Sequence, residues 1–224
     1  YTREGDVERF EIRSRLKRPA SLRLRAAARA SQVAGVTVNG QKAEWPCIPA
    51  VGEPVIAILA QQADDANVEI RWKGHKPASV ECPKIVGLGE PLVARCGDAL
   101  VSEVRDPQEM LKEASCAANE LRAIAAGRLG HRTAFARLEQ DDLIWWAPLE
   151  VEIRPPLEIS HSGVDWPSGE VEFVVRNNTD KPLAGSAVVR CGGAVERIDV
   201  QTALRSESAP IRLPAKDLVP GTNP

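Results

Sequence analysis

This 224-residue sequence has few aromatic residues and histidines, and no long apolar run. It contains one Met, one Tyr, three Phe and three His. No stretch of about 18 apolar residues is present, so we expect no membrane insertion. The 29 Lys and Arg are scattered among 31 Asp and Glu, which gives a formal net charge of -2. Without a basic field to hold a phosphate backbone, a nucleic-acid partner is not expected.

The sequence also lacks the motifs of common catalytic and cofactor chemistry. No Gly-x-Ser-x-Gly elbow accompanies the histidines, and His131 is expected to be structural. The glycines of 87–89 precede an expected strand rather than a helix, which argues against a nucleotide site. The acidic pairs 64–65 and 141–142 fall in expected hairpin turns, where we expect solvated side chains, with a calcium site as the lesser alternative. We therefore expect no enzyme, no cofactor and no metal site.

The five cysteines form an odd set without C-x-x-C spacing, so they do not resemble a zinc site. They are Cys47, Cys82, Cys96, Cys116 and Cys191. We expect them to be small buried residues, because free cysteine is among the most often buried residue types. A disulfide between Cys82 and Cys96 is an open alternative, since spacing alone does not give the distance between their Cα atoms.

Alternation of polar and apolar residues predicts β-strands in the first part of the chain. The alternation is clear at 7–14 and 21–27, where charged residues separate apolar ones. Asn39-Gly40 predicts a tight hairpin turn, because both residues tolerate positive φ. A second hairpin is expected around the acidic turn at 64–67, with Trp72 on its buried face.

A third, long hairpin is expected between 131–138 and 143–153. Its second strand contains Pro148, which predicts a bend or bulge because proline cannot donate a hydrogen bond to a ladder.

One segment departs from the alternation and predicts a helix over 107–126. Asp106 is the expected N-cap, Pro107 the first helical residue and Gly127 the stop. Apolar residues recur at helical spacing through the segment: Met110, Leu111, Ala114, Ala117, Ala118, Leu121 and Ile124. We expect this helix to lie across a sheet.

The candidate domain boundary is Arg154-Pro155-Pro156, because consecutive prolines favour a stiff, extended connector. Short strands follow at regular spacing, separated by turns rich in Gly, Pro, Asn and Asp; they are 157–159, 170–177, 183–191, 194–201 and 209–213. The predicted fold is therefore mainly β. A larger β-sandwich domain with one helix would cover 1–154, and a small Ig-like β-sandwich would cover 155–224.

Five tryptophans are a high number beside three Phe and one Tyr. Exposed aromatic rings suit sugar binding, because a pyranose ring stacks its apolar C–H groups on a flat π-surface. Trp145 and Trp146 are adjacent on an expected strand and must point to opposite faces, so one is core and the other lies outside it. Trp146, Trp45 and Trp166 are the candidate carbohydrate contacts. The alternative is packing against a loop, the helix or a neighbouring domain.

Two resemblances extend these expectations. The segment 169–189 resembles bacterial Ig-like domains of the cell-adhesion-related (CARDB) and galactosidase-associated types. Its sequence is Gly169-Glu-Val-Glu-Phe-Val-Val-Arg-Asn-Asn-Thr-Asp-Lys-Pro-Leu-Ala-Gly-Ser-Ala-Val-Val189. Those domains are spacers or binding modules with no shared catalytic residue. The segments 36–40, 130–135 and 145–148 are similar to β-sandwich portions of bacterial glycoside-hydrolase-like proteins, where such sandwiches flank a helical-barrel catalytic domain. The present sequence has no trace of that barrel.

Together these features predict a non-catalytic accessory or scaffold fragment of a larger secreted or periplasmic bacterial protein, associated with carbohydrate processing or binding. Its expected partners are neighbouring domains of the same polypeptide, with carbohydrate as a candidate ligand. The alternative is a structural or adhesion protein with Ig-like modules along a surface-anchored chain. Because the chain starts at Tyr1 and 217–224 reads as a loop between strands, we expect more chain on at least one side.

Overall fold

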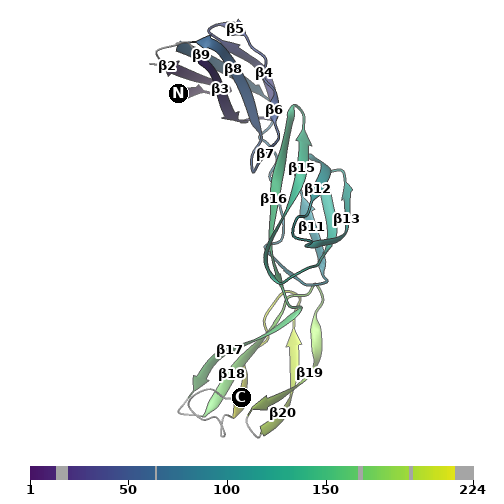
Figure 1. Cartoon of the computed structure of the whole chain (residues 1–224). Coiled ribbons are helices and arrows are strands. Elements are labelled where there is room, and N and C mark those ends of the chain that lie inside the picture. The colour runs from purple at the N-terminus through teal and green to yellow at the C-terminus, as the bar shows by residue number, and fades with distance from the viewer. Residues whose placement is uncertain (14–19, 64, 166–168, 192–193, 215–224) are drawn as a thin grey trace.

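The computed structural model describes residues 1–13, 20–63, 65–165, 169–191 and 194–214. These residues form 21 β-strands, and no helix occurs among them. Figure 1 shows three successive β-rich bodies along a curved, elongated molecule. We call them the first sandwich (1–73), the middle sandwich (85–154) and the last sandwich (157–214). The mainly β fold predicted from the sequence is confirmed.

The first sandwich consists of two sheets. The larger sheet has the order β1-β2-β9-β4-β5, formed by β1 (Thr2–Glu4), β2 (Val7–Arg13), β9 (Asp65–Lys73), β4 (Gln32–Val38) and β5 (Gln41–Lys42). The smaller sheet has the order β3-β8-β6, formed by β3 (Ala20–Ala27), β8 (Val55–Ala63) and β6 (Cys47–Ile48). Their facing sides bury Ile56 and Ile58 from one sheet and Val68 and Ile70 from the other.

One of the two turns predicted in this region is confirmed. Val38 pairs with Gln41 across a two-residue turn in which Asn39 has φ 52° and Gly40 φ 80°, the positive values that such turns need. The hairpin expected around 64–67 is wrong, because β8 and β9 belong to different sheets. Both strands carry a buried apolar stripe, and crossing from one sheet to the other lets the two stripes face each other across the core.

The middle sandwich also consists of two sheets. The first has the order β10-β16-β15-β12, with β7 also paired to β16; these are β10 (Ile85–Gly87), β16 (Leu143–Arg154), β15 (Gly130–Gln140), β12 (Leu100–Arg105) and β7 (Ala50–Val51). The second has the order β11-β14-β13, with β11 (Pro91–Arg95), β14 (Glu120–Ala125) and β13 (Leu111–Ala117). The long hairpin predicted from the sequence is confirmed as β15 and β16.

The helix predicted over 107–126 is wrong, because β13 and β14 form an antiparallel hairpin there. Asp106 does cap a backbone amide, but its Oδ2 accepts from the N–H of Leu111 at 2.7 Å in a turn. The apolar residues Leu121, Ala123 and Ala125 alternate with more exposed ones and are buried. Pairing with β11 and burial of this face outweigh the helix propensity of the alanines.

The outer strand of this hairpin, β13, lies at a sheet edge and is irregular. Its register with β14 shifts between Lys112 and Ser115, and Glu113 within the shift has φ 55°. This is a β-bulge on an edge strand.

The bend or bulge expected at Pro148 is absent, because the pairing of β15 with β16 continues through Phe135 and Pro148 without a shift. Even-numbered residues of β16 direct their backbone N–H and C=O groups away from β15. On that side the carbonyl of Trp146 accepts from the N–H of Gly52, and the N–H of Glu152 donates to the carbonyl of Lys84. The nitrogen of Pro148 faces the same edge, between β7 and β10. Proline is tolerated there because no ladder hydrogen bond is required of it.

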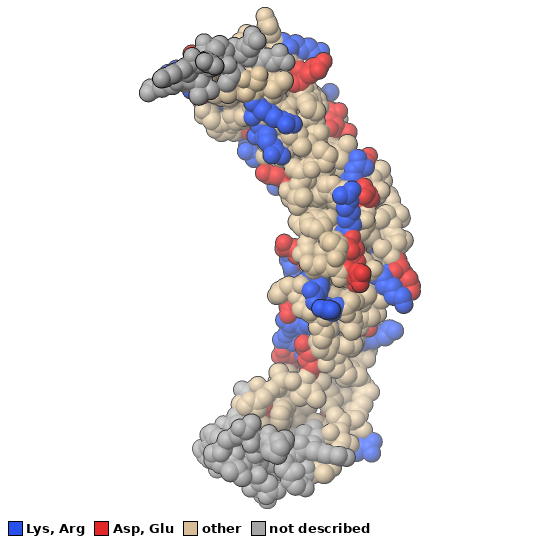
Figure 2. Space-filling model, in the orientation of Figure 1, with Lys and Arg blue, Asp and Glu red and all other residues tan. Residues whose placement is uncertain are grey.

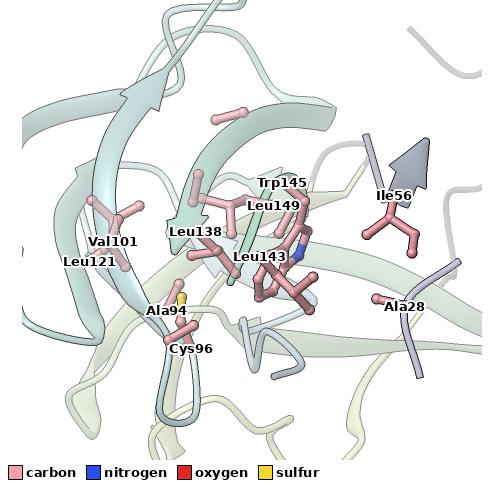
Figure 3. Packing of buried hydrophobic residues seen from close by; sticks show 14 of the residues in the cluster. Ala28, Ile56, Ala94, Cys96, Val101, Leu121, Leu138, Leu143, Trp145 and Leu149 are labelled. Carbon is pink, nitrogen blue, oxygen red and sulfur yellow. The ribbon is translucent and has the colours of Figure 1, made fainter. Parts of the chain in front are cut away.

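One cluster of buried residues runs through the first and middle sandwiches. Figure 3 shows Leu143 and Trp145 of β16 lying toward Ala28 and Ile56 of the first sandwich, with Leu121 and Ala94 on the other side. Trp72 is buried in this cluster, as predicted. The region expected to be one domain therefore holds two pairs of sheets with a shared core, and the boundary near residue 154 stays a prediction.

The last sandwich has a sheet of order β17-β18-β21 and a pair β19-β20. These strands are β17 (Leu157–Asp165), β18 (Glu170–Asn177), β21 (Ile211–Pro214), β19 (Leu183–Cys191) and β20 (Ala194–Thr202). The five strands predicted beyond the two prolines are confirmed. Val171, Val175 and Val200 are its buried apolar residues among those described. No helix in the described ranges has the length and apolar character needed to cross a membrane.

Candidate functional site

The two adjacent tryptophans of β16 point to opposite faces of their sheet, as the sequence predicts. Trp145 is 1% exposed and belongs to the core, whereas Trp146 is partly exposed on the outer face. The guanidinium of Arg105 lies 4.5 Å from the centroid of the Trp146 ring, within the range of a cation–π contact. Part of the aromatic surface of Trp146 is therefore covered by the protein itself.

Trp146 borders a shallow hollow of about 540 Å³. Its lining is mostly apolar and consists of Val51, Arg105, Asp106, Pro107, Phe135 and Trp146. Val51 is 63% exposed, and the Oδ1 atom of Asp106 is buried without a hydrogen-bond partner in the described part of the chain. The Trp146 hollow thus presents an aromatic surface and a cation, whereas the unpaired carboxylate oxygen is buried.

The other two tryptophan candidates do not join this hollow. Trp45 is partly buried and packs against the core cluster of the first and middle sandwiches. Trp166 lies outside the described residues. The structure thus places one of the three candidate carbohydrate contacts in a concave surface.

The joint between the first and middle sandwiches is built from backbone pairing. The short strand β7 extends from the first sandwich and pairs in parallel with β16, with Val51 opposite Trp146. Gly52 donates to the carbonyl of Trp146 at 2.8 Å. The thiol of Cys47 adds two bonds to the backbone of Ile144, donating to its carbonyl at 3.3 Å and accepting from its N–H at 3.2 Å.

The turn of the β15–β16 hairpin forms a second tie across this joint. The Ser31 hydroxyl donates to Asp141, and the N–H of Val33 donates to Asp142 at 3.1 Å. The hydrogen bond from Ser31, followed by one from Gln32, holds the pKa of Asp141 below its ordinary value. Both aspartates are exposed in a hairpin turn, as predicted, and in addition they accept hydrogen bonds from the first sandwich.

The joint between the middle and last sandwiches is organised around Asn178, which is 6% exposed. Its side-chain amide donates to the carbonyl of Pro155 at 2.8 Å and to Glu158 at 3.0 Å. Its backbone N–H donates to the carbonyl of Pro156 at 2.9 Å, and its own carbonyl accepts from Gly87 at 3.1 Å. The two prolines are thus held by a residue of the last sandwich that also bonds to the middle one.

Gly87 is required by the closeness of this contact. A Cβ atom at residue 87 would lie 2.8 Å from the Asn178 carbonyl oxygen and 3.0 Å from Cγ of Glu90. Real Cβ atoms do not approach a carbonyl this closely, so a larger residue would push the two sandwiches apart. A further tie is the hydrogen bond of 3.0 Å from the N–H of Asp180 to Glu90.

The other reactive side chains of the described residues include free thiols and carboxylates. No group of three or more His, Cys, Asp or Glu in these ranges could hold a metal ion. The described cysteines are free thiols, including Cys82 and Cys96, the pair considered for a disulfide. Burial raises the pKa of both of these thiols to about 11, which makes them poor nucleophiles. Cys96 is buried as expected, but Cys116 is exposed.

One buried carboxylate has a structural role in the first sandwich. Glu8 is 1% exposed and accepts hydrogen bonds from Tyr1 at 2.8 Å, Trp72 at 3.0 Å and Arg29 at 3.0 Å. Desolvation alone would raise the pKa of Glu8, but these three donors together hold it below the ordinary value. The carboxylate ties the N-terminal residue to the core.

Figure 2 shows basic and acidic side chains interspersed along the visible face of the molecule, without a large area of one sign. Many are neighbours across strands, such as Arg9 with Glu69 at 2.9 Å and Arg95 with Glu120 at 3.3 Å. Exposed pairs of this kind contribute little to stability, but they balance the surface charge.

The fold and the joints define a modular β-protein whose modules are tied to one another by polar contacts. A scan against protein-family models finds no match, and a search of curated proteins finds none either. Among solved structures, the chain is similar to the crystal structure of the N-terminal eight Ig domains of Down Syndrome Cell Adhesion Molecule (DSCAM) isoform 1.30.30. The identity is 10% and the TM-score 0.28, over 95% of this chain and 38% of that one. A score at this level does not establish a shared function.

The joints are what sequence reasoning missed. The bond from Ser31 to Asp141 spans 110 positions, and β7 is two residues long, so neither produces a local pattern. Two signals were present: the Asn177-Asn178 pair after an apolar strand and Gly87 between two apolar residues.

Proposed function

We propose that this chain is a structural segment without catalytic activity, in which Ig-like β-modules in series hold neighbouring domains at a fixed separation, as in structural or adhesion proteins. The observation that carries the proposal is that both joints are tied. β7 pairs with β16 at one joint, and Asn178 binds both prolines and Gly87 at the other. Together with the elongated arrangement in Figure 1, these ties support a stiff rod rather than loosely linked beads.

The surface supports this proposal as well. A spacer must avoid association with its own copies, and the interspersed charges of both signs on the face shown in Figure 2 favour solubility. The neighbouring domains of the same polypeptide would be the partners that the rod positions.

Small-angle X-ray scattering of the whole chain tests the rod. A compact chain of this length has a radius of gyration of about 17 Å. Three units in line, each about 40 Å long as a 12-residue strand such as β16 implies, should give roughly 30 Å or more. A value near that of the compact chain would contradict the proposal.

A double variant, Pro155→Gly with Pro156→Gly, serves as the comparison. It loosens the second joint and should broaden the distribution of distances within the molecule. A bead-aggregation assay distinguishes an adhesive role from a spacer role. Clustering of beads coated with the wild-type chain would show that copies of the chain bind one another.

Contact with carbohydrate at Trp146 is a second proposal, supported by the hollow in which the ring lies beside Arg105 and Asp106. A sugar would stack on the part of the ring that Arg105 leaves open and accept a hydrogen bond from the guanidinium of Arg105. Titration of oligosaccharides followed by tryptophan fluorescence tests this, with Trp146→Ala as control. A response that persists in the variant, or no response in the wild type, would exclude the site.

A further inference from the structure

The chain enters and leaves the middle sandwich through two strands that lie side by side. It arrives along 74–84, where Glu81 exchanges two backbone hydrogen bonds with Arg95 of β11, then enters β10 and departs from the end of β16. The two strands are parallel, with Ile85 opposite Glu152 and Gly87 opposite Arg154. The two connections of this sandwich to the rest of the rod are therefore neighbours across one ladder.

This arrangement determines how the middle sandwich responds to tension applied at the two ends of the rod. Tension would first load the Glu81–Arg95 pair, and once that pair opens it would draw β10 toward the first sandwich and β16 toward the last. Because the strands are parallel, these opposite forces slide one along the other, so all hydrogen bonds between them are loaded at the same time.

The first sandwich has the opposite geometry. Its first long strand, β2, starts at Val7 opposite Arg71, close to the end of β9 where the chain leaves. Those two strands are antiparallel and would be pulled from the same end, so their hydrogen bonds would open one after another.

The bonds that would bear the sliding force are identified by their donors and acceptors. Leu88 donates to the carbonyl of Arg154 and Glu152 donates to that of Lys84, both at 2.8 Å. Nearer the start of β16, on the same edge, the parallel strand β7 adds the hydrogen bond from the N–H of Gly52 to the carbonyl of Trp146. This second patch also slides when the first and middle sandwiches are pulled apart.

We propose that this edge of β16, with β10 and β7 paired to it, is a mechanical clamp that lets the rod carry tension. The inference rests on the proposed function, because a clamp in this position has a use only if the two ends of the rod are pulled. It adds a load-bearing role to that of a spacer.

Single-molecule force spectroscopy on the whole chain, held at its two ends, tests the clamp. Leu88→Pro removes one N–H of the clamp and should lower the unfolding force of the middle sandwich by about half, because rupture under load follows the unfolding barrier. The peak that shifts in this variant identifies the middle sandwich, whose 70 residues add roughly 25 nm of extended chain.

Two control variants separate the clamp from general stability. Ile85→Pro lies in β10, but its amide points away from β16, as the neighbouring Gly87 amide does when it donates to Asn178. Met110→Ala leaves a cavity in the core but removes no backbone N–H of the clamp, and lowers equilibrium stability. Both should keep most of the force. If Met110→Ala lowers the force as much as Leu88→Pro does, there is no clamp.

A change in pulling direction keeps the test valid if Leu88→Pro does not fold. A handle inserted in the exposed turn at Ala118 and Asn119, paired with the C-terminal handle, bypasses β10 and should give a force about twofold lower than end-to-end pulling. Equal forces in both directions would overturn the clamp. Small-angle scattering tests the rod and force spectroscopy tests the clamp. A compact chain in scattering would refute the rod, and equal forces in the two pulling directions would refute the clamp.

Discussion

Gly87→Ala tests the close contact between the middle and last sandwiches. The added Cβ would lie 2.8 Å from the Asn178 carbonyl oxygen, so the oxygen has to move by about 0.6 Å to reach an ordinary van der Waals distance. That movement lengthens the hydrogen bond of 3.1 Å from the Gly87 N–H to the same oxygen. Losing such a bond costs about 1 kcal/mol, and overpacking adds about 1–3 kcal/mol.

Hydrogen exchange measured by mass spectrometry reads out this change. A loss of about 2 kcal/mol at the joint should make amides that exchange by local opening of Gly87 and Asn178 roughly thirtyfold faster. Scattering should show a broader range of shapes at the same time, because the last sandwich is no longer held in one orientation.

Gly185→Ala is the matched control. A Cβ there meets no atom within 4 Å, so we expect its effect to stay within about 0.5 kcal/mol. If Gly87→Ala has the same amide exchange rates and scattering profile as Gly185→Ala, the joint does not depend on this contact. The tied second joint would then no longer support a rigid rod.

Three further predictions concern other parts of the chain. Glu8→Ala should lower the free energy of unfolding by about 3 kcal/mol in urea titrations, because it leaves the buried N–H of Trp72 unpaired and removes the bonds from Tyr1 and Arg29; no change would show that the carboxylate is not structural. The pKa of Asp141 is held down in the folded state by Ser31, so its contribution to the first joint is present above the unfolded pKa and lost as the pH falls below about 4. Hydrogen exchange at that joint, divided by the intrinsic exchange rate at each pH, should show more frequent opening in acid, and Asp141→Asn should reduce this pH dependence. Cys116 is exposed and Cys96 buried with a raised pKa, so a maleimide at neutral pH should label Cys116 first and Cys96 only on unfolding; equal rates would contradict the burial.

The sequence predicts strands well where large apolar residues alternate with polar ones. In β16 burial alternates along the whole strand, and polar residues separate the apolar ones from Leu149 onward. Leu138, Leu143 and Leu149 are buried as the alternation requires. The small strands after the two prolines follow it too, because valines such as Val171 and Val175 mark one face.

The helix prediction failed because alanine carries little information about burial. Ala114, Ala117 and Ala118 complete an apolar stripe at helical spacing, yet all three are exposed at the edge of a sheet. Their small side chains fit either structure, and the partner strand β11, which decides between the two, lies outside the segment.

The candidate site was found only in part, for a related reason. Adjacent tryptophans must face opposite ways, so an outward Trp146 follows from local geometry. That Arg105 covers its ring and Val51 reaches it from the first sandwich depends on strand order, which alternation does not encode.

The bulge in β13 bears on how such molecules behave in a crowd. A straight outer strand displays a row of free amides and carbonyls that a neighbouring molecule can zip onto, and many copies side by side would then grow into fibrils. The bulge around Glu113 breaks that row, and the charged side chains of Lys112 and Glu113 keep this part of the edge solvated. Replacing the bulge with regular valine-rich sequence would be expected to turn dispersed molecules into lateral bundles.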